Sequence, residues 1–148
     1  MQKTLILIKP DAVQRRLVGE IISRIERKGL KIVAIKMLQI SPELARRHYA
    51  EHVGKPFYPA LEKYVTSSPA VVLVAAGEEA ISVVRLMIGP TNGQVAPPGT
   101  IRGDFSTSYR FNLIHASDGE VSAKNEIATF FDASELVDYD LSLAPWVG

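Results

Sequence analysis

The chain has 148 residues, of which 47% are hydrophobic and 22% charged, with a formal net charge of +1 and no cysteine. This composition is that of an ordinary folded protein, and it excludes a disordered chain, a disulfide framework and a thiolate metal site. The length predicts a single domain over residues 1–148. The first apolar run is too short for a signal peptide and no run is long enough for a membrane span, so we expect a cytoplasmic location.

Charge is unevenly distributed along the chain. Residues 1–60 carry twelve Lys or Arg against five Asp or Glu, whereas residues 61–148 carry five against eleven. The two halves can interleave and cancel much of this charge, or they can leave a basic face for an anionic ligand such as a phosphate. The overall balance is too weak for a typical nucleic-acid module, so we expect no dedicated nucleic-acid site and no membrane partner.

The first part of the chain alternates strands and helices. A β-branched apolar run predicts a strand over residues 3–9. Apolar residues at helical spacing predict a helix over 17–28, which ends at Gly29, a favoured helix-ending residue. Alternation predicts a strand over 30–40. Ser41-Pro42 then begins a helix, because serine caps helices well and proline suits the first helical position.

The later elements complete an α+β order. The sequence predicts a short helix, an inner strand, a helix, a strand and a helix over residues 59–65, 70–76, 78–88, 113–115 and 120–131, with irregular segments over 89–112 and from 132. This order fits the ferredoxin-like split βαβ arrangement, a four-stranded antiparallel sheet with helices packed on one face. A parallel doubly wound sheet is the alternative.

The irregular stretch over 89–112 is a candidate site because long loops in compact proteins are usually functional or disordered. Six glycines or prolines from Gly89 to Gly99 argue against disorder. Its hydroxyls, amides and arginine suit a phosphate or ribose site. The polar residues are Thr91, Asn92, Thr100, Arg102, Asp104 and Asn112. The alternative is an ordinary surface loop.

Three histidines are candidates for chemistry. His115 ends an apolar strand, and Glu126 on the following helix could orient its imidazole; a purely structural histidine is the alternative. Ser117 and Glu120 have the spacing of a capping box, which predicts Ser117 as the helix N-cap. His48 and His52 are four residues apart, as zinc ligands can be, but no third ligand follows nearby. We expect these two at the surface or lining a pocket.

The common phosphate-binding motifs are missing. The sequence has no Walker loop, no G-x-G-x-x-G and no protein-kinase signature set. If the protein binds nucleotides, its cations must come from separate segments, and Lys9, Arg85 and Arg102 are the candidates.

Five motifs together resemble one known family, nucleoside diphosphate kinase. The motifs, in order and without gaps, are Ile8-Lys9-Pro10-Asp11, His48-Tyr49-Ala50-Glu51-His52, Gly54-Lys55-Pro56-Phe57-Tyr58, Pro98-Gly99-Thr100-Ile101-Arg102-Gly103-Asp104 and Asn112-Leu113-Ile114-His115-Ala116-Ser117-Asp118. The resemblance covers nearly the whole chain. It implies reversible ping-pong transfer of a γ-phosphate from a nucleoside triphosphate to a nucleoside diphosphate through a phosphohistidine, with little preference for the base.

The resemblance also implies roles for individual residues. The catalytic set that it implies has four residues. His115 matches the nucleophile and Glu126 the carboxylate that holds its other ring nitrogen. Lys9 matches a lysine near the ribose hydroxyl and the transferring phosphate, and Tyr49 a tyrosine that supports that region. The nucleotide-binding set that it implies is Lys9, Phe57, Arg85, Thr91, Arg102 and Asn112. Mg²⁺ is the implied cofactor, held mainly by the nucleotide phosphates with no protein ligand assigned, and the implied assembly is a homohexamer or homotetramer.

The chain departs from the family pattern at five positions. Gly93 stands in place of a proline, which predicts a softer loop, and Ala116 and Gly119 replace a glycine and a serine. Tyr109 and Arg110 replace a small aliphatic residue and a glycine. Tyr109 could stack on the second face of the base, or it could turn to solvent or pack under the loop. A nucleotide-binding module without turnover is the competing function, and an RNA-recognition module is disfavoured because no RNP1-like strand is present.

Overall fold

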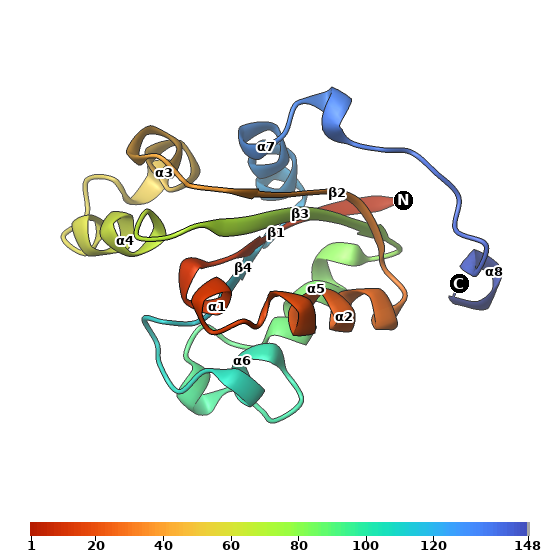
Figure 1. The fold of residues 1–148 in the computed structure, drawn as a ribbon, viewed down its shortest axis with the longest axis horizontal. Helices are drawn as coiled ribbons and strands as arrows, with labels where there is room; N and C mark the ends of the chain where they lie inside the picture. Colours follow the sequence, from red (N-terminus) through yellow and green to blue (C-terminus); the bar gives the residue numbers. More distant parts are fainter. Residues whose placement is uncertain (148) are drawn as a thin grey trace.

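A four-stranded sheet forms the centre of the protein in the computed structural model, which describes residues 1–147 (Figure 1). Its strands lie in the order β2 (Lys31–Leu38), β3 (Ala70–Gly77), β1 (Gln2–Ile8) and β4 (Ile114–Ala116). Every neighbouring pair is antiparallel, so the predicted ferredoxin-like α+β fold is confirmed and the parallel alternative is wrong. Gly148, the last residue of the predicted domain, lies outside the described residues.

Helices cover both faces of the sheet, not one face as the sequence predicted (Figure 1). One face carries α1 (Pro10–Gln14), α2 (Val18–Lys28), α5 (Ala80–Ile88) and α6 (Ile101–Phe105), and the other carries α3 (Pro42–His48), α4 (Tyr58–Val65) and α7 (Glu120–Phe130). Strand β1 shows the reason, because Ile6 and Ile8 enter the first core while Leu5 and Leu7 enter the second. A strand buried on both sides must be apolar at every position.

Two of the three helix ends predicted from the sequence are confirmed. Helix α2 ends at Gly29, whose φ of 105° is in the left-handed region that glycine favours. Ser41 caps α3, and its Oγ accepts a hydrogen bond of 3.1 Å from the backbone N–H of Leu44. The N-cap of α7 is Gly119 rather than Ser117, because the Ser117 side chain is turned into the protein and bonds elsewhere.

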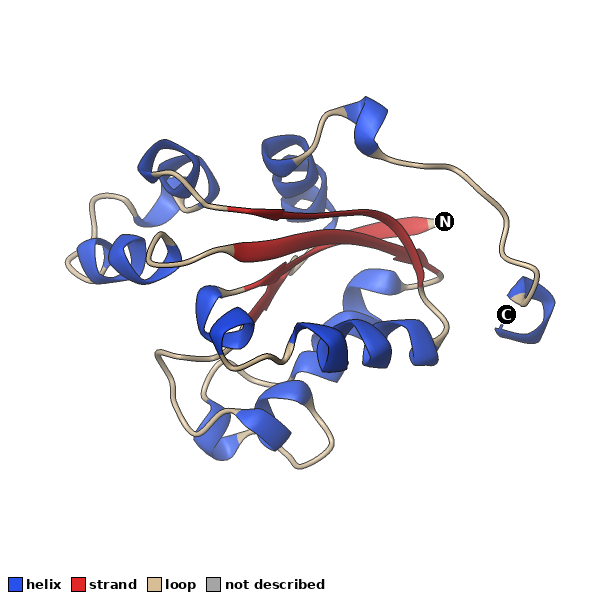
Figure 2. Cartoon of the chain, in the orientation of Figure 1, coloured by secondary structure: helices blue, strands red, loops and turns tan. Residues whose placement is uncertain are grey.

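The connection from α5 to β4 is more ordered than predicted, since it contains α6 and a 3₁₀ turn, η2 (Gly93–Val95) (Figure 2). Gly93 is buried, and a Cβ there would lie 2.4 Å from both the backbone oxygen and the Oγ of Ser106. Its N–H also donates to Ser108 O at 3.2 Å. A proline would clash and lose this hydrogen bond, so the loop is packed around glycine at this position.

The C-terminal tail includes two short helical turns, η3 (Ala133–Glu135) and α8 (Ala144–Val147), where the sequence predicted an irregular segment. It runs along one end of β2, where the N–H of Val137 donates to Val33 O at 2.8 Å. Ile35 and Met37, farther along this edge strand, and Trp146 in the tail stay exposed. None of the helices within residues 1–147 combines the length and apolar character that crossing a membrane requires.

Candidate active site

Strand pairing decides which way His115 faces. His115 lies opposite Leu7 in the β1–β4 register, and Leu7 belongs to the core beneath α3 and α7. Because side chains alternate along a strand, Ile114 and Ala116 face the other core while His115 faces α3 and α7. The imidazole is half-buried at the edge of the sheet.

Glu126 on α7 holds the His115 ring through a chain of hydrogen bonds. The Nε2 atom of His115 lies 3.1 Å from Glu126 Oε1, and the Ser117 hydroxyl donates to the same oxygen at 2.7 Å. Ser117 Oγ in turn accepts from the N–H of Leu5 at 3.1 Å. Burial raises the pKa of Glu126, but the bonds from His115 and Ser117 outweigh it and keep that pKa below its ordinary value. The carboxylate is therefore charged and fixed.

Ser117 is a site residue that sequence reasoning missed. Its spacing to Glu120 satisfied a capping rule, and that local signal concealed the contact with Glu126, nine positions away. Ser117 is fully buried, so its hydroxyl needs partners inside the protein. It orients Glu126 through this hydrogen bond and acts as a positioning residue.

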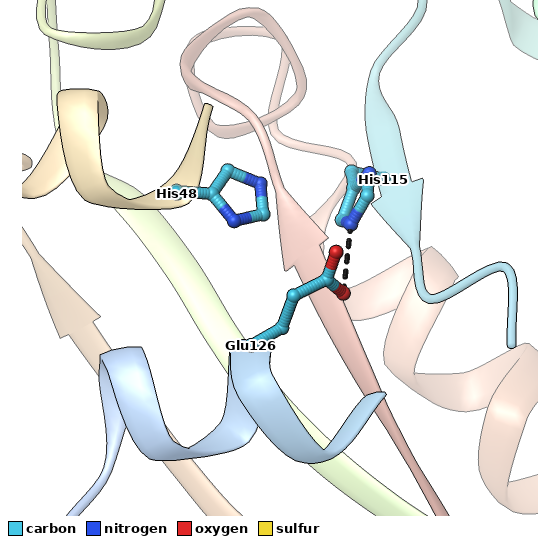
Figure 3. Close-up of side chains that lie close together, drawn as sticks. All are labelled: His48, His115 and Glu126. Carbon is cyan, nitrogen blue, oxygen red and sulfur yellow. Dashed lines mark hydrogen bonds and ion pairs between the residues drawn. The ribbon is translucent and has the colours of Figure 1, made fainter. Parts of the chain in front are cut away.

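His48 lies beside His115, with ring centroids 4.8 Å apart and an edge-to-face angle of 85° (Figure 3). Burial, followed by the charge of His115, lowers the pKa of His48 to about 3, so its ring is neutral. Neither His48 nitrogen has a hydrogen-bond partner among residues 1–147. The prediction that His48 and His52 line a pocket is confirmed, because both border the cavity next to His115.

That cavity has a volume of about 350 Å³ and is bordered by His48, Tyr49, His52 and His115. Tyr49 follows α3, its ring centroid is 4.4 Å from that of His48, and its hydroxyl is buried without a partner. Burial raises the pKa of Tyr49, so the hydroxyl stays protonated. Phe57 lies beyond His52, at a ring distance of 5.4 Å, and is half-exposed. The structure therefore connects Phe57, Tyr49 and His115 through one row of rings.

Lys9 is buried at the end of β1 and joins a second set of predicted residues. Its Nζ donates to Asn112 Oδ1 at 2.8 Å, and Asn112 Nδ2 donates to the backbone oxygen of Thr91 at 3.2 Å. Burial, followed by the nearby charge of Arg102, lowers the pKa of Lys9 to about 8. Lys9 is thus a cation whose charge is costly until an anion arrives.

Arg102 is only 4% exposed, and all three guanidinium nitrogens are bonded to backbone oxygens. Its Nε donates to Asn112 O at 3.2 Å, Nη1 to Gly89 O at 2.9 Å and Nη2 to Ile114 O at 2.5 Å. Burial, followed by the charge of Arg85, lowers the pKa of Arg102 to about 10, so it remains protonated at neutral pH. The side chain thereby fastens both ends of the 89–112 connection together.

Arg85 on α5 completes a pair of arginines around the histidine. Its Nη1 donates to Ala116 O at 3.2 Å, while Arg102 bonds Ile114 O. The two acceptors are the residues on either side of His115 in β4. Arg85 is exposed, so it differs from Arg102 in its freedom to reach a ligand. The cations predicted from separate segments do converge on β4.

Asp11 supports the same region from the start of α1. One carboxylate oxygen accepts from the N–H of Leu113 at 3.1 Å, and the other accepts from the Tyr64 hydroxyl. Leu113 is buried with a φ of 72°, a conformation that costs a non-glycine residue about 1–2 kcal/mol. Asp11 therefore helps to hold the turn that presents Asn112 to Lys9.

Tyr109 and Arg110 occupy the loop before β4. The Arg110 guanidinium lies 5.3 Å from the centre of the Phe111 ring, and Phe111 packs edge-on against Tyr64. Tyr109 is 68% exposed. No aromatic contact holds the Tyr109 ring among residues 1–147, so it is free to meet a ligand.

Comparison with known proteins identifies the family. The nucleoside diphosphate kinase family model matches residues 2–136. A nucleoside diphosphate kinase from Rhodopirellula baltica is 57% identical over 147 residues, covering 99% of this chain and 97% of the relative, and one from Archaeoglobus fulgidus is 52% identical over the same shares. The structure is also similar to that of a halophilic nucleoside diphosphate kinase from Halobacterium salinarum in complex with CDP, with a TM-score of 0.97, 47% identity and coverage of 99% of this chain and 98% of that one. The chain belongs to the nucleoside diphosphate kinase family and is a phosphotransferase.

Proposed function

We propose that His115 carries the phosphate in this family's ping-pong transfer and that Nδ1 is the atom phosphorylated. The observation that supports this is the bond between Nε2 and Glu126, which leaves the other ring nitrogen pointing away from the carboxylate (Figure 3). A neutral ring that donates its Nε2 proton to Glu126 has its free lone pair on Nδ1. The ring therefore supplies the nucleophile, and Glu126 stabilises the charge that develops on it.

The reaction then follows in two matched halves. Nδ1 attacks the γ-phosphorus, the bond to the bridging oxygen breaks, and the nucleoside diphosphate leaves with that oxygen's electron pair. The charge that develops on the ring is balanced by Glu126, which Ser117 holds in place. In the second half an oxygen of the acceptor's β-phosphate attacks the same phosphorus, and the lone pair returns to Nδ1. Positioning and charge, rather than proton transfer, carry most of the catalysis.

Lys9, Arg85 and Arg102 supply the positive charge for the phosphates in this proposal. Arg102 reaches them only by exchanging some of its three carbonyl contacts, whereas Arg85 has one. Asn112, already bonded to Lys9, and Thr91 would contact the ribose hydroxyls and phosphates. Phe57 would stack on the base, since its half-exposed ring lies next to His52, which borders the cavity.

Members of this family generally use a divalent cation, and we assign Mg²⁺. Mg²⁺ prefers oxygen ligands and commonly binds the phosphates of a nucleotide substrate. The oxygens that fit Mg²⁺ best are therefore the nucleotide's own phosphates. The cation would reduce their negative charge during transfer.

The isolated half-reactions test this function. The protein is incubated with γ-labelled ATP and Mg²⁺, freed from nucleotide, and then mixed with GDP. We expect an acid-labile, base-stable phosphoprotein in the first step and labelled GTP in the second. A protein that binds ATP but transfers no label in either step would be the binding module without turnover.

Nucleotide affinity should decrease above about pH 8 because Lys9 loses its charge there. A bound phosphate favours protonated Lys9, so at pH 9 binding should take up nearly one proton and Kd for ADP should rise up to about tenfold per pH unit. Lys9 has a pKa of about 8 in the folded protein and an ordinary value of 10.5. Between these values the unfolded chain binds more protons, so the contribution of Lys9 to the free energy of unfolding increases with pH. Calorimetry in buffers of different ionisation enthalpy measures the uptake. Lys9→Met should take up no proton on binding ADP. Wild-type binding without proton uptake at pH 9 would refute the role of Lys9.

Tyr109→Val should weaken purine nucleotides more than pyrimidine nucleotides if the ring covers the second face of the base. Stacking of a base on an aromatic side chain contributes about 1–3 kcal/mol, which corresponds to several-fold to about a hundredfold in Kd for ADP and GDP. CDP should lose less because its ring is smaller. Titration calorimetry decides this, and equal affinities of variant and wild type for ADP and CDP would place Tyr109 in solvent instead.

The protein should assemble into a homohexamer or homotetramer. The apolar side chains of Ile35 and Met37 on edge strand β2, and Trp146 in the tail, are exposed in the isolated chain, and exposed apolar groups on an unpaired strand favour association. Light scattering at micromolar concentration should give four or six chains. A particle of one chain's mass, 16.2 kDa, would contradict this. The cytoplasmic location and the single-domain organisation remain predictions from the sequence.

A further inference from the structure

His48, His115 and Glu126 come from α3, β4 and α7 and face one another (Figure 3). Each offers one ligand atom, and these three atoms lie within 4.8 Å of one another. Two imidazoles and one carboxylate form a donor set that proteins use for Zn²⁺, with a fourth position left to water or another ligand. The three side chains therefore have the donor atoms that Zn²⁺ prefers, and these atoms lie close together.

His48 has no partner that explains its position. Both ring nitrogens are buried, and neither makes a hydrogen bond within the part of the chain that the structure describes. An unpaired buried polar atom costs about 1–3 kcal/mol, so it calls for a compensating role. The phosphate transfer uses His115 and Glu126 but leaves His48 without a function. A lone pair on His48 is available to a ligand that enters the cavity bordered by all three residues.

The three ligand atoms need to move only slightly closer together to hold a metal ion. Bonds of about 2.0–2.2 Å from zinc place tetrahedral ligand atoms about 3.3–3.5 Å apart. His115 and Glu126 are already 3.1 Å apart, and His48 can move without breaking a hydrogen bond. Nitrogen donors favour Zn²⁺ and other transition metals over Mg²⁺, so this site differs from the nucleotide's own cation site.

We propose that His48, His115 and Glu126 form a binding site for a transition-metal dication such as Zn²⁺, and that the metal excludes phosphorylation of His115. The exclusion rests on the proposed function, whereas the binding does not. Zn²⁺ takes the lone pair of His115 Nε2 and displaces its proton to Nδ1 of the same ring. The Nδ1 lone pair that attacks phosphorus is then lost, and no proton leaves the protein.

The competition must work in both directions. When Nδ1 carries the phosphoryl group, Nε2 keeps its proton in the bond to Glu126, so no lone pair remains there for a metal. The phosphoenzyme should therefore resist Zn²⁺, and the unphosphorylated enzyme should lose activity while the metal is bound. Chelation should restore activity because no covalent change has occurred.

Zn²⁺ titration of the nucleotide-free protein against a chromogenic chelator tests the site itself. We expect one high-affinity Zn²⁺ per chain in the wild type. His48→Gln and Glu126→Gln should each bind more than about 100-fold more weakly, since even residues outside the ligand set cost 10–100-fold. His52→Gln is the matched control and should bind as the wild type does. Equal binding by His48→Gln, or an equal loss in His52→Gln, would overturn the assignment.

Circular dichroism of each variant separates lost ligands from lost folding. Glu126→Gln carries the test if His48→Gln fails to fold. Repeating the titration on the phosphoenzyme tests the exclusion: weaker binding by more than about 100-fold is expected, and unchanged binding would refute it. If no phosphate can be placed on His115 at all, the proposed function fails while the binding arm still stands on its own result.

Discussion

His115→Ala should abolish the phosphoenzyme and reduce nucleotide transfer by about 10⁴-fold or more, because the variant lacks the nucleophile. Nucleotide binding should change little, since Lys9, Arg85 and Asn112 remain in place. Gel filtration with labelled ATP measures the phosphoenzyme, and calorimetry with ADP measures binding. A variant that keeps wild-type turnover with label on another residue would show that His115 is not the carrier.

Glu126→Gln is the comparison for this variant. The amide can still contact Nε2, but it does not balance the charge of the phosphorylated ring. Transfer should therefore slow less than in His115→Ala, and the phosphoenzyme should still form. Ser117→Ala should lie closer to the wild type, because it frees Glu126 to move without removing it. This order separates the nucleophile from the residues that position it.

Arg102→Met should lower the free energy of unfolding by about 3–5 kcal/mol. The variant fills the space of the side-chain stem but leaves the oxygens of Gly89 and Ile114 without this donor, and each unpaired buried acceptor costs about 1–3 kcal/mol. The oxygen of Asn112 keeps its 2.8 Å hydrogen bond from the backbone N–H of Ile114. Denaturant unfolding measures the loss. Nucleotide affinity should also fall, because the 89–112 connection would no longer be fastened to β4.

Arg85→Met provides the matched control for Arg102→Met. Arg85 is exposed and donates a single hydrogen bond of 3.2 Å to Ala116 O, so its loss should cost less than about 1 kcal/mol of stability. Its effect should fall on phosphate affinity instead. If the two variants lost the same stability, the carbonyl contacts of Arg102 would not be structural.

Much of the fold follows from local patterns in the sequence. Gly29 and Ser41 mark real helix ends, because backbone conformation and capping are decided by a few neighbouring residues. Coverage of both sheet faces was misjudged, although the unbroken apolar run in β3 is what burial on both sides requires. Helix α6 was missed because it has five residues and includes Gly103, a poor helix former.

The site was predicted in its residues more than in its contacts. Motifs supplied His115 and Lys9, and the helix predicted after His115 supplied Glu126. Spacing alone could not show that Ser117 bonds Glu126 instead of capping α7. Arg102 was expected to face phosphates, and its bonds to three carbonyls depend on how β4 meets the preceding loop. The contact between His48 and His115 joins α3 to β4, a strand far along the chain. Such contacts exist only in the assembled fold.

The most direct test is to identify which ring nitrogen of His115 carries the phosphate. Two-dimensional ¹H–³¹P NMR of the phosphoenzyme, denatured in base after reaction with ATP, distinguishes the two phosphohistidine isomers by which ring proton couples to phosphorus. Because Nε2 is held by Glu126, we predict Nδ1-phosphohistidine. Phosphate on Nε2 would contradict the account, since that nitrogen could not then donate to Glu126.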